Sequence, residues 1–480
     1  MSSTHQTGLR KNAIGVAGIV FFVVAAAAPL TVVVGSVPLA ISMGGGVGIP
    51  SLFLIAGLIY LLFAVGYCAM NRHIGNAGAF YTFVTRGLNP QLGAGCAFMA
   101  LLAYNAVQFA LYGGFGYFLS EALKSHWGID VPWIALVLAT LWLVHFFGSR
   151  DIDFSGKLLA ALMIAETAIV IAIDVAIILS NGNGHGFTVA PFTPSQILAP
   201  GLGIGMIFAI CAFLGFEATA IFSEEARNPV RTIPRATYLA VISIMLFYAF
   251  SAWAIIQAYG ADGAMEMATK DPGNLWLKVC AELLGHGAAS LMNVLVLTSM
   301  FAAILAFHNS ITRYLFAMGR EQLLWKGLAR THGVHQSPHI AGRVQTLTAL
   351  LAMGTFAVFD QDPYLVIYSW MAALSTIGMI TVQVFASLAV IGFFWKDARG
   401  TTLWQRLLAP AASAVLLAVS LLLVINNLSL MSGSDSWVVR SFPYLVLLTC
   451  VAGMGCAMRL KSTHPEQYRV MGQGLINTTR

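Results

Sequence analysis

Long apolar stretches separated by short polar segments form the main pattern of this amino-acid sequence. A helix needs about 20 mostly apolar residues to cross the hydrocarbon core of a bilayer, with a range of about 17–25. Twelve stretches meet this length, and they cover residues 13–42, 48–70, 92–122, 131–147, 155–180, 201–224, 235–259, 284–318, 343–359, 364–395, 407–425 and 441–459. The pattern therefore predicts an all-α integral membrane protein with 12 transmembrane helices.

Two of these stretches are interrupted where a continuous apolar helix is expected. The first contains AAAAPLTVVVG at residues 25–35, and the sixth contains FAICAFLGFEATA at residues 208–220. A proline removes a backbone donor from a helix, and a glycine adds backbone freedom. We therefore predict breaks at residues 28–33 and 211–216. Corresponding breaks in the two halves of a membrane protein indicate the substrate site of a secondary transporter, because unpaired backbone at that depth must line a cavity or pack against protein.

Composition supports the membrane assignment and excludes several other classes. The 480 residues are 58% hydrophobic and only 9% charged, whereas soluble domains carry about 25% charged residues. The net charge of +6 does not indicate a nucleic-acid partner, because the basic residues are dispersed between apolar stretches. The six cysteines form no CxxC motif, so we expect no disulfide framework and no metal site. We also expect no cofactor.

The lysines and arginines predict the orientation of the chain. With the N-terminus inside, 21 of the 25 fall on the inner side. The four on the outer side are Lys124, Lys270, Lys278 and Arg440. This positive-inside bias predicts two cytoplasmic tails, at residues 1–12 and 460–480. We expect the protein in the cell membrane, and specifically in the inner membrane of a bacterium.

The two breaks together suit a small zwitterion. Freed N–H groups at the start of the outer half-helix lie at the positive end of its dipole, where a carboxylate binds well. Freed carbonyls at the end of the opposing half-helix suit an ammonium group. Two antiparallel broken helices are therefore a natural receptor for an α-amino acid. A simple kink at Pro29 is the alternative for the first break, and the matching second break disfavours it.

Three segments carry more specific motifs. They are AGAFYTFVTRGLNPQLG at 77–93, FLGFEATAIFSEEARNPVRTIPRA at 213–236 and FHNSITRYLFAMGRE at 307–321. Together they resemble the amino acid–polyamine–organocation transporter superfamily, and in particular its amino acid permeases. The resemblance covers roughly residues 12–425.

The resemblance implies a LeuT-type fold with a 5+5 inverted repeat. Spans one to five would form the first repeat at residues 13–180, and spans six to ten the second at residues 201–395. Two peripheral spans would follow at residues 407–459.

In that superfamily the substrate lies between the first, third, sixth, eighth and tenth spans. The substrate contacts that the resemblance implies here are Pro29, Leu30, Thr31, Val32, Val33, Tyr104, Gln108, Cys211, Ala212, Phe213, Phe216 and Phe307. Many relatives have a glycine-rich run in the first break, which this chain lacks. Tyr104 and Gln108 share a helix face, and hydrogen bonds between helices explain them equally well.

Ionisable groups inside membrane spans are costly and therefore indicate function. Glu217, Glu166 and His308 are the candidates for proton coupling. Burial favours the protonated form of a carboxyl group, and Glu217 follows directly after the second break. A permanently paired structural acid and a packed histidine are the alternative interpretations. Asp174 lies nearer the outer end, where we expect it to be solvated or locally hydrogen-bonded.

Sodium coupling is disfavoured by the resemblance. Sodium-coupled members of the fold carry hydroxyl groups about one turn before the Phe307 position, whereas this chain has Ala302 and Ala303 there. A hard cation needs several oxygen ligands, which alanines do not supply.

The sequence therefore predicts a secondary active transporter that imports an amino acid, coupled to protons, by alternating access. The apolar breaks favour a zwitterion with a small or apolar side chain, and an amino acid/amine exchanger and a polyamine or amine importer are the alternatives. A channel would need a continuous polar face, and a membrane enzyme a clustered catalytic set such as HExxH, so we predict no enzyme. The expected partners are the amino acid or amine, protons and the lipid bilayer, with no nucleic acid. The sequence leaves the oligomeric state open.

Overall fold

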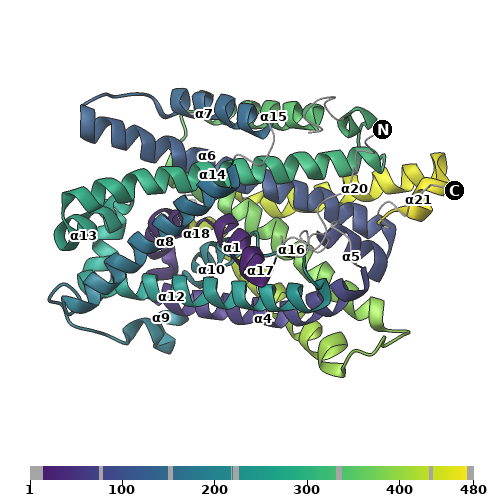
Figure 1. Ribbon diagram of the computed structural model, residues 1–480, viewed down its shortest axis with the longest axis horizontal. Coiled ribbons are helices and arrows are strands. Elements are labelled where there is room, and N and C mark those ends of the chain that lie inside the picture. The colour runs from purple at the N-terminus through teal and green to yellow at the C-terminus, as the bar shows by residue number, and fades with distance from the viewer. Residues whose placement is uncertain are drawn as a thin grey trace, which may run out of the picture.

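The fold is a bundle of helices (Figure 1). The computed structural model describes residues 15–74, 79–149, 155–217, 219, 226–330, 338–431 and 436–472. Its regular elements within these ranges are all helices, written α for α-helices and η for short π- or 3-10-helical turns. The predicted tail at residues 1–12 lies outside the described ranges, as do residues 473–480.

The helices follow one another without long irregular connections. The first half comprises α1 (Val16–Ala26), α2 (Pro29–Thr31), η1 (Val32–Ser36), α3 (Val37–Ala40), η2 (Ile41–Gly45), η3 (Gly46–Gly48), α4 (Ile49–Ile74), α5 (Ala79–Gly87), α6 (Pro90–Trp127), α7 (Trp133–Gly148) and α8 (Ser155–Leu179). The second half begins with η5 (Ala190–Phe192), α9 (Pro194–Ile197), α10 (Leu202–Cys211), α12 (Pro229–Lys270), η7 (Pro272–Asn274), α13 (Leu275–Leu284), α14 (His286–Arg320), η8 (Lys326–Ala329), α15 (His339–Val358), η9 (Pro363–Tyr368) and α16 (Ser369–Phe394). The chain ends with η10 (Trp404–Leu408), α17 (Ala409–Asn426), α18 (Leu428–Met431), α19 (Trp437–Arg440), α20 (Phe442–Thr463) and α21 (Pro465–Val470).

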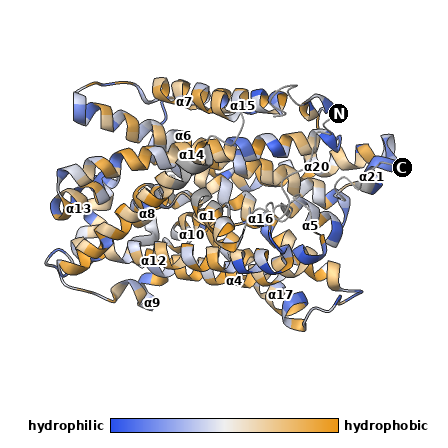
Figure 2. Cartoon of the chain, in the orientation of Figure 1, coloured by the Kyte–Doolittle hydropathy of each residue, from blue (hydrophilic) through white to orange (hydrophobic). Residues whose placement is uncertain are grey.

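Eight of the described helical segments are long and apolar enough to cross a bilayer. Two shorter apolar helices, α7 and α10, accompany them. Figure 2 shows apolar residues along the lengths of the helices and polar residues at ends such as α21. Hydrocarbon offers no hydrogen-bond partner, so the backbone must satisfy itself within helices. These features indicate a multi-pass membrane protein, whereas the full count of 12 crossings stays a prediction.

The first predicted break is present but shorter than expected. Helix α1 ends at Ala26, and Ala28 adopts a left-handed conformation with φ 46° and ψ 69°. The chain is helical again from Pro29, so the prediction of a break through residues 28–33 is wrong beyond Ala28. The reason is that proline, with its fixed φ and missing N–H, suits the first position of a helix. Pro29 therefore starts the second half-helix.

The second predicted break lies where the sequence indicated, one residue later than expected. Helix α10 ends at Cys211, and irregular turns follow through residues 212–217. Gly215 has a φ of +104°, which side-chain-bearing residues rarely adopt. Glycine therefore sets the path of the chain between α10 and the carboxylate that follows.

The two broken helices touch at their predicted outer ends through glycines. A Cβ atom on Gly201 would lie only 2.1 Å from the carbonyl oxygen of Gly44. One on Gly45 would lie 3.1 Å from the Cα of Gly205. Backbone thus packs directly on backbone between η2 and α10, which fixes the spacing of the two broken helices.

We expect Gly201→Ala to lower the thermal unfolding midpoint of the purified protein. The added methyl group meets rigid backbone, and such overpacking costs about 1–3 kcal/mol. Gly354→Ala is the matched control, because nothing lies within 4 Å of a Cβ at that position of α15. Equal midpoints for the two variants would contradict the close approach.

Candidate functional site

Glu217 lies at the centre of the second break. Its side chain is only 2% exposed. One carboxylate oxygen accepts the Gly215 N–H at 3.0 Å, and the other accepts the Tyr104 hydroxyl at 2.7 Å. The backbone carbonyl of Glu217 accepts the Tyr67 hydroxyl at 2.9 Å. The carboxylate therefore satisfies an N–H group that the break frees, and it joins the break to α6.

Tyr104 extends this contact to α14. Its ring centroid lies 6.1 Å from that of Phe307 and 6.1 Å from that of Tyr314. The structure thus brings together three residues that the sequence singled out separately, namely Glu217, Tyr104 and Phe307. They come from the second break, the third predicted span and the eighth.

A second polar cluster joins the first break to α14 and α8. The Thr31 hydroxyl donates to Ser299 Oγ at 3.0 Å, and the Ser299 hydroxyl hydrogen-bonds the Glu166 carboxylate. Glu166 is only 3% exposed. The carbonyl of Ala27, freed at the end of α1, accepts the Tyr248 hydroxyl of α12 at 2.9 Å. Sequence reasoning missed Ser299 and Tyr248, because helical periodicity does not reveal which distant helix faces a break.

The other predicted residues of the first break are deeply buried. Pro29 and Leu30 begin the second half-helix beside Thr31, and Val32 and Val33 continue it as the π-helical η1. In a helix the first N–H groups lack intrahelical acceptors. The N–H groups of Leu30 and Thr31 occupy such positions, and they are the groups that suit a carboxylate.

The aromatic residues of the second break pack against α4. Phe213 and Phe216 each lie 5.0 Å from Tyr60, measured between ring centroids, and both are fully buried. Ring pairs of this kind add about 0.5–1.5 kcal/mol beyond their burial. Their side chains therefore anchor the break to α4.

Cys211 and Ala212 flank the end of α10. The Cys211 thiol hydrogen-bonds Thr376 of α16, whereas Ala212 is buried with the neighbouring apolar core. These two residues connect the break to the tenth predicted span.

Gln108 belongs to a buried hydrogen-bond network between helices. Its Nε2 donates to the Ile304 carbonyl of α14 at 3.1 Å. Gln345 of α15 donates from its Nε2 to Gln108 Oε1 at 2.6 Å and to Asn105 Oδ1 at 2.9 Å. The side chain thus forms hydrogen bonds between helices, which is one of the two interpretations that the sequence left open.

The two remaining ionisable groups lie apart from these clusters. His308 packs at the side of α14 that faces α7 and α15, where its ring lies against Gly148 and near Gly342. Asp174 is 2% exposed and accepts the Ser251 hydroxyl of α12 at 2.6 Å. Solvation of Asp174 was therefore the wrong alternative, and local hydrogen bonding the right one. A coupling role for His308 stays a prediction.

Paired broken helices with buried polar groups beside them are the arrangement that secondary transporters use to bind substrate. The geometry thus defines the class as a helical membrane protein with a transporter-like site. Residues 18–459 match the amino acid permease family, so the chain belongs to that family. Its members are permeases, which transport solutes and are not enzymes.

Several relatives share most of their length with this chain. The branched-chain amino acid permease BcaP of Bacillus subtilis is 24% identical over 72% of this chain and 73% of its own. The low-affinity putrescine importer PlaP of Escherichia coli is 25% identical over 84% and 86%. The serine/threonine exchanger SteT of Bacillus subtilis is 23% identical over 63% and 67%. The similarity thus extends to permeases for amino acids and for an amine.

We expect Gln345→Leu to destabilise the protein by about 1–3 kcal/mol, because it leaves buried acceptors on Gln108 and Asn105 without a donor. Adding Gln108→Leu should cost less than the sum of the two single changes, since the residues share one network. The measurement is thermal or denaturant unfolding of the purified variants.

Thr348→Val is the matched control on α15, where the exposed hydroxyl bonds only its own helix through the Val344 carbonyl. Strict additivity of the two glutamine changes would argue against the network. A raised KM for substrate with unchanged stability in Gln108→Leu would assign Gln108 to substrate binding instead.

Proposed function

We propose that this protein is a secondary active transporter that imports an amino acid, driven by protons, through alternating access. The observation that carries the proposal is the Glu217 carboxylate, which accepts the Gly215 N–H inside the second break and the Tyr104 hydroxyl of α6. Glu217 thereby links a proton-binding group to the contact between a broken helix and its neighbour.

The proposal includes the LeuT-type architecture with 12 crossings. Residues 13–180 and 201–395 form the two inverted repeats, and residues 407–459 the peripheral spans. Both termini are cytoplasmic, and the membrane is the inner membrane of a bacterium. The one-sided distribution of lysine and arginine supports this orientation.

The substrate is an amino acid with a small or apolar side chain. Its carboxylate binds the N–H groups of Leu30 and Thr31 at the start of the second half-helix, where the helix dipole is positive. Val33 and Phe307 supply apolar surroundings. The names of two relatives, a branched-chain amino acid permease and a serine/threonine exchanger, support this class of substrate.

An amine importer is the second candidate function, and one observation favours it. Glu166 reaches the first break through Ser299 and Thr31, so a second carboxylate is available for a second ammonium group. The putrescine importer among the relatives is consistent with this alternative. The sequence alone gave no reason to expect an acid next to the first break.

Proton coupling follows from how Glu217 bonds its neighbours. A hydrogen bond to an ionised carboxylate is about twice as strong as one between neutral groups. When Glu217 takes up a proton, its bond from Tyr104 weakens, and the second broken helix is released from α6. Proton uptake thus favours the movement of that helix during alternating access.

Sodium requires a separate test. Thr31, Ser299 and Glu166 bring together oxygen atoms of the kind that hard cations bind. The sequence argument against sodium considered Ala302 and Ala303 and did not include these groups.

Uptake into proteoliposomes tests the proposal directly. Radiolabelled leucine, serine and putrescine are supplied outside, under an imposed pH gradient, a sodium gradient or neither. We expect accumulation of one of the two amino acids, driven by an inside-alkaline pH gradient and abolished by a protonophore. Accumulation of putrescine alone supports the amine alternative, and uptake that needs internal substrate supports an exchanger. Dependence on the sodium gradient alone would contradict proton coupling.

Glu217→Gln tests the proton carrier. The amide keeps the size of the side chain and cannot release a proton, so we expect substrate exchange to persist while pH-driven accumulation falls to background. Glu466→Gln is the control, because that carboxylate is exposed and pairs with Arg469 on α21. Normal pH-driven accumulation in Glu217→Gln at neutral pH would remove Glu217 from the coupling role.

A further inference from the structure

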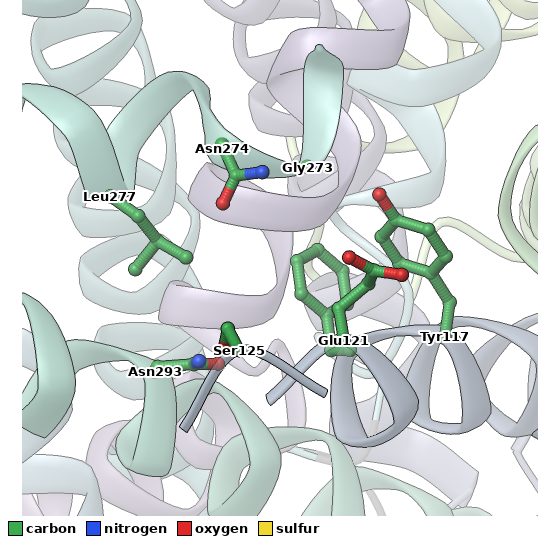
Figure 3. A pocket seen from close by; sticks show the side chains of 8 residues that line it. Tyr117, Glu121, Ser125, Gly273, Asn274, Leu277 and Asn293 are labelled. Carbon is green, nitrogen blue, oxygen red and sulfur yellow. The ribbon is translucent and has the colours of Figure 1, made fainter. Parts of the chain in front are cut away.

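A pocket opens at the predicted outer end of the bundle, about 20 Å along α6 from Tyr104. It lies between α6, the η7–α13 connection and the start of α14, and it encloses about 370 Å³ measured out to its open mouth. The side chains that matter for its chemistry are Tyr117, Glu121, Asn274, Leu277 and Asn293 (Figure 3). Figure 3 shows Glu121 and Tyr117 side by side on α6, opposite Asn274 and Leu277.

Oxygen acceptors dominate the lining of this pocket. The Oδ1 atom of Asn293 is buried and has no hydrogen-bond partner among the described residues. Asn274 donates from its Nδ2 to Asp271 at 2.9 Å, which fixes its amide so that Oδ1 points into the pocket, as Figure 3 shows. An occupant therefore has to bring N–H donors to satisfy these oxygens.

Charge around the pocket is negative. Three carboxylates, on Glu121, Asp271 and Asp362, lie within electrostatic range of Tyr117. Asp271 forms an ion pair with Lys278 at 2.8 Å, and Asp362 accepts backbone N–H groups at the start of η9. Glu121 has no hydrogen-bond or ion-pair partner within the described part of the chain. The occupant is therefore expected to be a cation.

We propose that this pocket binds a primary ammonium group of an amino acid or an amine. Glu121 is its counter-ion, and the Oδ1 atoms of Asn274 and Asn293 accept its N–H groups. Leu277 supplies an apolar wall for the carbon atom that carries the nitrogen. A bare divalent ion fits less well, because calcium needs about 6–8 oxygen ligands and this pocket has an apolar side.

The position of the pocket gives the bound ammonium group a path to the first broken helix. The Tyr117 ring stacks on that of Tyr364, with centroids 4.7 Å apart and planes 17° apart. The Tyr364 hydroxyl donates to the Gly35 carbonyl of η1 at 2.8 Å. On the other side, a Cβ on Gly273 would lie 2.6 Å from the Tyr117 hydroxyl oxygen. Tyr117 is thus held between the pocket wall and the ring that binds the first broken helix.

Methylammonium is the probe, and tetramethylammonium at equal ionic strength is the control that lacks N–H donors. We expect methylammonium to raise the unfolding midpoint of the purified full-length protein, and tetramethylammonium to have no effect. Glu121→Gln should need about tenfold more methylammonium for the same shift. Glu282→Gln, a matched change of an exposed carboxylate on the adjacent α13, should respond like the unaltered protein.

An unchanged methylammonium response in Glu121→Gln would overturn the proposal, as would equal stabilisation by tetramethylammonium. Uptake kinetics then identify the source of the ammonium group. A several-fold higher KM in Glu121→Gln at unchanged kcat points to the transported substrate, whereas an unchanged KM points to a free amine. Because the unfolding measurement needs no transport, a failure of the proposed transport function would leave it interpretable.

Discussion

A backbone hydrogen-bonding group that a helix releases inside a bilayer has to find its partner within the protein, because hydrocarbon offers none. This constraint organises the centre of the molecule. The Gly215 N–H finds the Glu217 carboxylate, and the Ala27 carbonyl finds the Tyr248 hydroxyl. Each break therefore exists only together with a polar side chain that satisfies it.

The partners of the breaks also determine what the breaks are connected to. Glu217 binds Tyr104 of α6, and Thr31 binds Ser299 of α14, which in turn binds Glu166 of α8. Glycines let the outer parts of the broken helices approach backbone to backbone, as at Gly201 and Gly44. The same contacts that stabilise the resting arrangement are those a transport cycle has to break and remake. A change in the charge of one buried carboxyl group can thus bias the position of a whole helix.

The sequence predicted those features that depend on one segment at a time. Apolar length predicted the helices, and the glycine at 215 marked a backbone conformation that the structure contains. Pro29 was misinterpreted, because proline interrupts a helix when it is internal and starts one when it is first. Features that need two distant segments were out of reach. Nothing in the local pattern connects Ser299 to Thr31 or Tyr248 to Ala27, and burial of Asp174 depends on Ser251 from another helix. His308 likewise shares a helix with Phe307 but faces different neighbours.

An experimental density map of the protein with a bound amino acid tests the central claim most directly. The account predicts a left-handed residue at Ala28, an irregular path through residues 212–217, and the substrate carboxylate on the N–H groups of Leu30 and Thr31. An unbroken helix through either segment would contradict it, as would a substrate bound away from both breaks.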